Sequence, residues 1–314
     1  MMLDPQLAAV IAPGAGPRLE DVTPPEARLI YREQCQALAA AVRDVAHVDV
    51  QDFTVPGAEG PLAARVYRTP EEGSRPTIAF FHGGGYVVGD LDSHDAIARV
   101  LARDLGAVIV SVAYRLAPEH PFPAAAEDAI AAATWIAEHA AGLGGEPAFA
   151  VAGDSAGAAL AAVAALALRD DAAAVAGQLL FYPAADPATE YASVRENAEG
   201  YLLERATIAW FLSHYAPEAQ PDDPRLAPLR ADALAGVAPA VVVVAEHDPL
   251  RDSGEAFALA LDAAEVPLTL RRCDGMVHGF LSFAGVSDAA AAHTHGALAS
   301  FREILDAARE GAER

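Results

Sequence analysis

The sequence contains no lysine: all 21 of its basic residues are arginine, against 44 aspartates and glutamates. The formal net charge of −23 argues against binding to nucleic acid or to anionic membranes, because phosphate-rich partners need clustered cations. A phosphate loop of the type G-x-x-x-x-G-K-[ST] is excluded as well, since its lysine is missing. Two explanations of the acidity stay open, adaptation to high salt and plain solubility.

Cysteine and long apolar runs are scarce too. Cys35 and Cys273 make neither a metal-binding spacing nor a disulfide framework, so we expect two reduced thiols. The longest apolar run, AGAALAAVAALAL at 156–168, falls short of the ~20 residues that a membrane-spanning helix needs and is expected to be a buried helix. The N-terminal stretch MMLDPQLAAVIAPGAGPR carries an aspartate where a signal peptide carries lysine or arginine. These features predict a cytoplasmic protein.

Apolar residues are plentiful, at 53% of the chain, which is enough for one large core. Stretches with the apolar patterns of β-strands lie at 48–55, 62–68, 77–82, 107–114, 147–153, 177–183, 240–246 and 267–273. The first two alternate apolar and polar residues, as an antiparallel pair would, and the others are continuous apolar runs typical of parallel strands covered on both faces. Helical patterns lie between them, at 94–104, 124–142, 155–169, 253–264 and 288–309. This alternation predicts an α/β fold, a single domain over 1–314 with an eight-stranded, mostly parallel sheet flanked by helices.

Two segments break the alternation. Residues 1–45 have an amphipathic helical pattern, clearest in LIYREQCQALAAAV, and residues 184–235 mix short helices with proline-rich loop. The second segment carries large apolar side chains that an insertion does not leave uncovered, namely Tyr191, Tyr201, Leu202, Leu203, Trp210, Phe211 and Tyr215. We expect both segments to form one helical cap over the carboxyl edge of the sheet.

The stretch FAVAGDSAGAAL contains a G-x-S-x-G pattern, from Gly153 to Gly157, between an apolar strand and an alanine-rich helix. A sharp turn from strand to helix strains the middle residue and exposes its side chain, and flanking glycines remove the Cβ atoms that would clash. The helix then presents its N-terminal amides and the positive end of its dipole to Ser155. Ser155 is therefore the candidate nucleophile, since a serine that only caps a helix would need neither glycine.

A serine nucleophile needs a base, and a neutral imidazole needs a carboxylate that fixes its tautomer. In sheet hydrolases these partners follow in the order serine, acid, histidine, each after the carboxyl end of a strand. Asp248 follows the strand expected to end near Glu246, and His278 follows the strand expected to end near Cys273. These two residues are the candidate acid and base.

Three other carboxylates compete for the role of the acid. Asp252 lies at the cap of the next helix, Asp274 precedes His278 rather than facing it, and Asp154 must point away from the serine at the turn. We expect all three to be structural. The same expectation holds for the histidines outside the loop after the last strand, among them His82, His94, His120, His247, His293 and His295.

The stretch FFHGGGYVVGD places Gly83, Gly84 and Gly85 directly after a strand. A dinucleotide fingerprint G-x-G-x-x-G fails here, because Val88 stands where its last glycine should be. In hydrolases with a G-x-S-x-G turn, this position supplies the second element of the oxyanion hole. Backbone N–H groups of this loop and of Ala156 would converge on a carbonyl oxygen as it becomes anionic, each contributing about 3 to 4 kcal/mol.

Taken together, these motifs resemble the bacterial hormone-sensitive-lipase-like (family IV) esterases of the α/β-hydrolase superfamily. The resemblance is carried by HGGGYVVGDLDSHD (82–95), YRLAPEHPFPAAAED (114–128), GDSAG (153–157), DPLRDSGEAFA (248–258) and HGF (278–280). It implies an α/β-hydrolase fold with Ser155 as nucleophile, Asp248 as acid and His278 as base, and it implies oxyanion donors at Gly83, Gly84, Gly85 and Ala156. The chain departs from the usual family pattern at Ala158 and Ala159, which replace Gly-Asn, and at Ser253, which replaces a glutamate.

The resemblance also implies a serine carboxylesterase that forms an acyl-enzyme intermediate and needs no metal or cofactor. We expect a small ester with a short to medium acyl chain as substrate, no nucleic-acid or membrane partner, and a homodimer as an assembly that is common in the family. Candidates for an apolar substrate pocket are Tyr201, Leu202, Phe211, Met276 and Phe280. An amidase, lactonase or carbamate hydrolase with the same triad stays open, and the remote alternative is a non-catalytic small-ligand receptor on the same fold, against which His278 argues.

Overall fold

The central sheet has the strands that the apolar patterns predict. Within the residues that the computed structural model describes (2–11, 18–70, 75–146, 148–171, 175–218 and 221–312), eight strands form one sheet in the order β1-β2-β4-β3-β5-β6-β7-β8. Their bounds are β1 (Asp49–Gly57), β2 (Gly60–Arg68), β3 (Thr77–Phe81), β4 (Val108–Val112), β5 (Phe149–Asp154), β6 (Val175–Phe181), β7 (Ala240–His247) and β8 (Leu268–Val277). β2 is antiparallel to β1 and to β4, and the other neighbouring pairs are parallel. The predicted eight-stranded, mostly parallel sheet is confirmed.

β8 is longer than its sequence pattern indicates. The expected strand ends near Cys273, but pairing with β7 continues to Val277, past a change of register between Ala245 and His247. Met276 and Val277 are completely buried there. The strand therefore continues up to the residue before His278. Residue 147, at which the expected fifth strand begins, lies outside the described residues.

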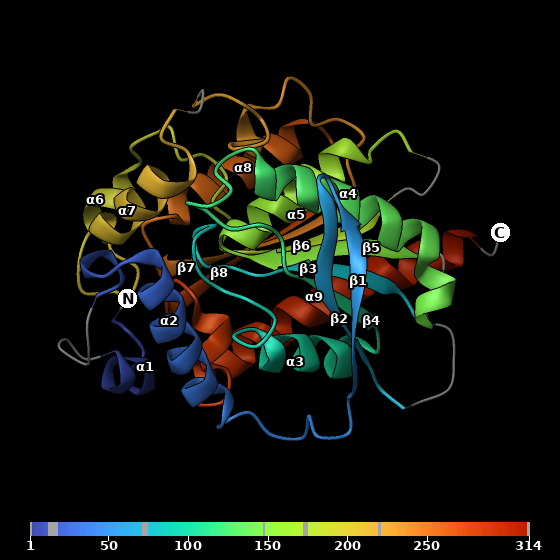
Figure 1. The fold of residues 1–314 in the computed structure, drawn as a ribbon, viewed down its shortest axis with the longest axis horizontal. Helices are drawn as coiled ribbons and strands as arrows, with labels where there is room; N and C mark the ends of the chain where they lie inside the picture. The colour runs from blue at the N-terminus through green and yellow to red at the C-terminus, as the bar shows by residue number, and fades with distance from the viewer. Residues whose placement is uncertain are drawn as a thin grey trace.

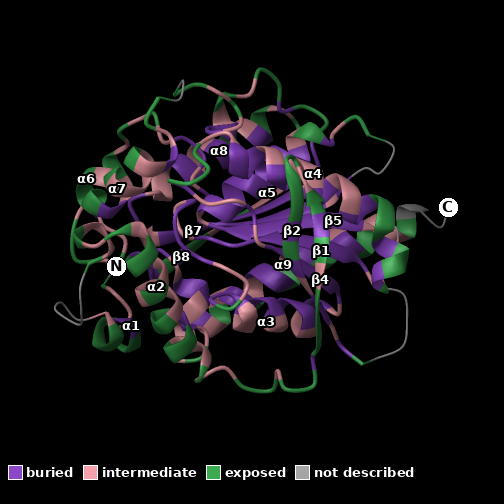
Figure 2. Cartoon of the chain, viewed as in Figure 1, coloured by how far each residue is buried: buried purple, intermediate pink, exposed green. Residues whose placement is uncertain are grey.

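Helices cover both faces of the sheet. α4 (Ala124–His139), α5 (Ala156–Ala167) and α8 (Arg251–Ala263) lie on one face, and α3 (Asp95–Leu105) and α9 (Asp288–Ala312) lie on the other (Figure 1). Successive residues of a strand point to opposite faces of the sheet. Phe81 therefore packs in the core on the side of α4, α5 and α8, and Phe80 packs in the core on the side of α3 and α9. Figure 2 shows the middle of the sheet buried, whereas β1 and β2 at its edge carry exposed residues. A short 3₁₀ helix, η2 (Ala140–Leu143), follows α4, and another, η4 (Phe280–Phe283), lies between β8 and α9.

The alanine-rich helix α5 lies very close to the sheet. Most of its residues are buried, and a Cβ atom added at Gly157 would lie 2.0 Å from the carbonyl oxygen of Phe81 in β3. Only glycine permits this approach of the helix to the strand. The first turn of α5 is thereby held against the carboxyl ends of β3 and β5.

The two segments outside the alternation lie together at one end of the molecule (Figure 1). The first contains α1 (Pro5–Val10), η1 (Leu19–Asp21) and α2 (Pro24–Ala39), and the second contains α6 (Ala192–Glu196), α7 (Arg205–Tyr215) and η3 (Pro228–Arg230). They touch where the hydroxyl of Thr207 on α7 donates to the Glu20 carboxylate on η1 at 2.9 Å. Residues 1, 12–17 and 219–220 of these segments lie outside the described residues. In the described part of the chain, no helix is both long and apolar enough to cross a membrane.

Candidate active site

Ser155 occupies a strained turn between β5 and α5. Its backbone angles are φ 56° and ψ −120°, a region that residues with a side chain rarely adopt. The turn is so tight that a Cβ atom at Gly153 would lie 2.3 Å from the carbonyl oxygen of Gly157. The N–H of Ser155 donates to the carbonyl oxygen of Phe181 in β6 at 2.9 Å. This geometry fixes the serine at the carboxyl edge of the sheet, where its side chain is only half-buried.

His278 and Asp248 meet Ser155 at the same edge. Nε2 of His278 lies 2.8 Å from Oγ of Ser155, and Nδ1 lies 2.8 Å from Oδ2 of Asp248. Asp248 is fully buried, and its other oxygen accepts the N–H of Leu250 at 2.7 Å. An ionised carboxylate can only accept hydrogen bonds, so the proton of the neutral imidazole belongs on Nδ1. Nε2 is then left to accept the hydroxyl proton of Ser155.

Two of the three competing carboxylates have other partners, and the third is exposed. Asp252 accepts the N–H of Ser193 at 2.8 Å and pairs with Arg251, also at 2.8 Å. Asp274 is exposed on β8. Asp154 binds the glycine loop. The contacts of Asp252 and Asp154 agree with the structural roles expected for these two residues.

The glycine loop departs from the expectation at its first residue. The N–H of Gly83 already donates to Oδ1 of Asp154 at 2.9 Å, so its inclusion among the oxyanion donors is corrected. Gly84 has φ +118°, and a Cβ atom there would lie 2.2 Å from the carbonyl oxygen of Val88. Gly85 has φ +58°, and a Cβ atom there would meet the ring of Phe211. The loop therefore leaves the amides of Gly84 and Gly85 as candidate donors.

Ala156 supplies a further amide from the other side of Ser155. It is the first residue of α5, and the N–H groups in the first turn of a helix have no acceptor within that helix. The positive end of the helix dipole lies at the same place. An anion bound beside Ser155 would thus face backbone N–H groups from two separate elements.

His82, which precedes the glycines, is a structural histidine. Its ring is buried and stacked on Tyr114 with the ring centroids 4.4 Å apart, and its Nδ1 lies 2.8 Å from the carbonyl oxygen of Gly83. Burial, reinforced by the neighbouring His94, lowers the pKa of His82 to about 4. The ring is consequently neutral at pH 7 and helps to shape the loop.

A cavity of about 660 Å³ opens over Ser155 and His278. Its lining is largely apolar and comes from the glycine loop and from both segments outside the sheet alternation. The lining includes Tyr31, Gln34, Cys35, Leu38, Gly84, Gly85, Leu202, Ile208, Phe211, Leu212, Leu250, Ser253 and Phe283. This volume suits a small organic ligand.

Only two of the five expected pocket residues line this cavity, Leu202 and Phe211. Met276 and Phe280 are completely buried in the core on the α3 and α9 side of the sheet, because they belong to the end of β8 and the turn after it. Tyr201 stacks on His247 with the ring centroids 4.8 Å apart. The structure therefore places these three residues outside the lining of the cavity.

One wall of the cavity was not expected from the sequence. It belongs to α2, where Tyr31, Gln34, Cys35 and Leu38 line the cavity at helical spacing. The spacing i, i+3, i+4 and i+7 that places them on one helix face is visible in LIYREQCQAL. The amphipathic pattern could have identified these residues, but not the cavity that they face.

The chain is similar to known ester hydrolases over most of its length. A family model described as the alpha/beta hydrolase fold matches residues 78–282. The carboxylic ester hydrolase LipN of Mycobacterium tuberculosis is 44% identical over 268 residues, covering 82% of this chain and 71% of LipN. The ethyl acetate hydrolase of Pseudomonas putida is 37% identical, covering 92% of this chain and 95% of its own length. The structure of a hyperthermophilic esterase from the archaeon Pyrobaculum calidifontis superposes with a TM-score of 0.90 at 38% identity, covering 97% of this chain and 99% of that one.

Cys35 should be chemically inert although it lines the cavity. Burial raises the pKa of its thiol to about 12, so at pH 8 roughly one thiol in 10⁴ is the reactive thiolate. We expect iodoacetamide at pH 8 to leave the activity of the folded protein intact and Cys35 unmodified in a peptide map. The same reagent in concentrated urea should modify both Cys35 and Cys273. Rapid loss of activity with alkylation of Cys35 would contradict this assignment.

Proposed function

Because the chain belongs to the hormone-sensitive-lipase-like esterases of the α/β-hydrolase superfamily and is a carboxylic ester hydrolase, we propose that Ser155, His278 and Asp248 are its catalytic triad. The observation that carries this proposal is the pair of 2.8 Å contacts from the His278 ring to the other two side chains. Nucleophile, base and acid then follow one another within hydrogen-bond distance, and Ser155 and His278 line the cavity.

The first half of the reaction forms an acyl-enzyme. Oγ of Ser155 attacks the acyl carbon of the ester while its proton passes to Nε2 of His278. The buried Asp248 carboxylate stabilises the imidazolium that results. The carbonyl oxygen becomes an oxyanion, which the amides of Gly84, Gly85 and Ala156 bind. Collapse of this tetrahedral intermediate expels the alcohol, which takes the proton from His278.

The second half releases the acid. Nε2 of His278, again neutral, takes a proton from a water molecule that attacks the acyl carbon. The same amides stabilise the second oxyanion, and Ser155 leaves with the proton returned by His278. Both halves pass through an anion at the same position, so one oxyanion hole serves both.

The shape of the cavity supports short to medium acyl chains. We propose that the two segments that contain α2 and α7 act as a cap, with Leu202 and Phe211 against the substrate. The cavity volume of about 660 Å³ is that of a site for a small organic molecule rather than for a long triglyceride. The apolar lining favours acyl chains, which gain free energy from leaving water.

We further propose that the enzyme acts in the cytoplasm on a small-molecule ester, with neither a nucleic acid nor a membrane as partner. The net charge of −23 supports the absence of polyanionic partners. The two cysteines are free and buried, which agrees with a reducing compartment. A homodimer remains a proposal from the family resemblance.

A panel of p-nitrophenyl esters from acetate to palmitate tests the function. We expect the highest kcat/KM between the acetate and octanoate esters, with a steep fall for palmitate, because the proposed cap encloses a cavity of the size that suits a small organic molecule. Ser155→Ala should reduce turnover to background, because it removes the hydroxyl oxygen that lies 2.8 Å from Nε2 of His278. Turnover by Ser155→Ala, or no turnover of any ester by the parent protein, would overturn the proposal.

Asp248→Asn should lower kcat by about 10⁴-fold, because an amide cannot hold the imidazole in the required tautomer. Asp274→Asn is the matched control: it removes an exposed carboxylate a few residues before His278 and should change kcat by less than about twofold. Steady-state kinetics of both variants with p-nitrophenyl butyrate distinguishes them. A large loss in Asp274→Asn with a small loss in Asp248→Asn would reassign the acid.

A further inference from the structure

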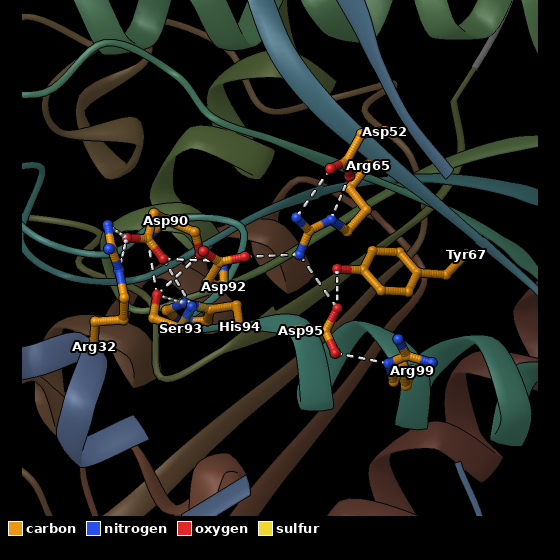
Figure 3. Close-up of polar contacts among 10 residues, drawn as sticks. All are labelled: Arg32, Asp52, Arg65, Tyr67, Asp90, Asp92, Ser93, His94, Asp95 and Arg99. Carbon is orange, nitrogen blue, oxygen red and sulfur yellow. Dashed lines mark hydrogen bonds and ion pairs between the residues drawn. The ribbon is translucent and has the colours of Figure 1, made fainter. Parts of the chain in front are cut away.

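The glycine loop is connected to α2 by a continuous series of polar contacts, here named the polar chain. Its members are Arg32, Asp90, Ser93, His94 and Asp154. Figure 3 shows the first four side by side, with Arg32 on α2 reaching the turn that precedes α3. The fifth member is the residue before the nucleophile.

At its inner end the polar chain ties the glycine loop to the turn of the nucleophile. Oδ1 of Asp154 accepts the N–H of Gly83 at 2.9 Å and lies 3.4 Å from Nε2 of His94. Asp154 and His94 are both buried, and a buried carboxylate is stable only when it is paired and hydrogen-bonded. Burial opposes its ionisation, but His94 and the amide of Gly83 together hold the pKa of Asp154 below its ordinary value. One oxygen atom thus joins the first glycine to the nucleophile turn.

The middle of the polar chain is a tight turn. Oγ of Ser93 lies 2.9 Å from Nδ1 of His94, donates to the carbonyl oxygen of Asp90 and accepts the N–H of Asp90. Oδ1 of Asp90 in turn accepts the N–H groups of Asp92 and Ser93. The imidazole of His94 is therefore held at both nitrogens, at one by Ser93 and at the other by Asp154. A ring held in this way cannot rotate without breaking a buried contact.

At its outer end the polar chain reaches α2. Nε of Arg32 donates to Oδ2 of Asp90 at 2.7 Å. Arg28, one turn earlier on α2, donates to the carbonyl oxygen of Val87 at 2.9 Å. Both acceptors lie in the stretch that follows the glycines. The helix that forms one wall of the cavity therefore also holds the glycine loop.

We propose that the polar chain positions the amides of Gly84 and Gly85, so that the placement of α2 sets the geometry of the oxyanion hole. The inference rests on the proposed function. An oxyanion hole stabilises charge only when its donors are preorganised, and a displacement of ~1 Å costs roughly 10²-fold in rate. Among the three glycines of the loop, Gly83 has an amide that is already bound, and its bond to Asp154 fixes where the next two amides point. The members of the polar chain are positioning residues, because they act through the loop.

Arg32→Gln breaks the outer link without disturbing the core, since 40% of the Arg32 side chain is exposed. With p-nitrophenyl butyrate we expect kcat to fall roughly 10-fold while KM stays within about twofold, because both tetrahedral intermediates lose stabilisation. Arg32→Lys keeps the charge and should recover most of the loss. Arg272→Gln is the matched control, because it removes a similarly exposed arginine (49%) from its ion pair with Glu255 and should change neither constant.

Inhibition by a short alkyl trifluoromethyl ketone separates positioning from a general loss of structure. Oγ of Ser155 adds to the ketone carbon, the hydroxyl proton passes to His278, and the π electron pair of the carbonyl becomes a lone pair of the oxyanion bound by the amides. We expect the inhibition constant in Arg32→Gln to rise by the factor by which kcat/KM falls. An unchanged kcat, or a lower kcat with an unchanged inhibition constant, overturns the proposal.

Two substitutions of Asp154 test the inner end in the same assays. Asp154→Asn keeps an oxygen acceptor for the N–H of Gly83, whereas Asp154→Ala removes it. We expect a loss in kcat of about 10²-fold for alanine and a clearly smaller one for asparagine. Equal losses in the two folded variants contradict the proposal, and if Asp154→Ala does not fold, Arg32→Gln decides it. The proposal about the polar chain is tested by the ratio of kcat in each variant to kcat in the parent protein. The proposed function is tested separately, by whether the parent protein turns over an ester at all.

Discussion

The strained turn at Ser155 is the constraint on which the rest of the site depends. Its φ of 56° costs of order 1–3 kcal/mol, which only a rigid surrounding structure can hold. Gly153 and Gly157 are required for it, since a Cβ atom at either position would collide with backbone. The turn lifts the Ser155 hydroxyl toward His278 and aims the first amides of α5 at the same point. The candidate nucleophile and one candidate oxyanion donor, the amide of Ala156, therefore depend on the same turn.

Parallel strands explain why distant residues meet at this turn. The carboxyl ends of β5, β7 and β8 lie at one edge of the sheet, and each is followed by one member of the proposed triad. The two segments outside the sheet alternation close the same edge and enclose an apolar cavity. Phe211 lies close to Gly85, and Arg32 donates to Asp90. These segments therefore also contact the glycine loop and the turn that follows it. In the proposed mechanism, the segments that bind the substrate therefore also contact the loop that stabilises the oxyanion.

The sequence identified those parts of the site that local patterns determine. Apolar runs bounded by turns predicted the strands. The glycines around Ser155 predicted a sharp turn that exposes the serine side chain. Tertiary contacts decided the rest. Gly83 has the same local sequence signal as Gly84, and only the packing of Asp154 beneath the loop shows that its amide is already bound.

The pocket residues show the same limit. Met276 and Phe280 flank His278 in the sequence, but the direction of β8 and of the turn after it sends both side chains into the core. Tyr31 and Cys35 line the cavity from a helix more than a hundred positions away from Ser155 in the sequence, and no local pattern says which surface that helix will face. Side-chain direction, unlike strand or helix formation, depends on how distant elements pack.

Reaction with diethyl p-nitrophenyl phosphate, followed by peptide mapping with mass spectrometry, tests most directly the claim that the strained turn makes Ser155 the nucleophile. We expect one diethylphosphoryl group per chain, located on Ser155, with activity lost in proportion to labelling. A phosphoryl group on another residue, or complete labelling of Ser155 with activity retained, would contradict the claim.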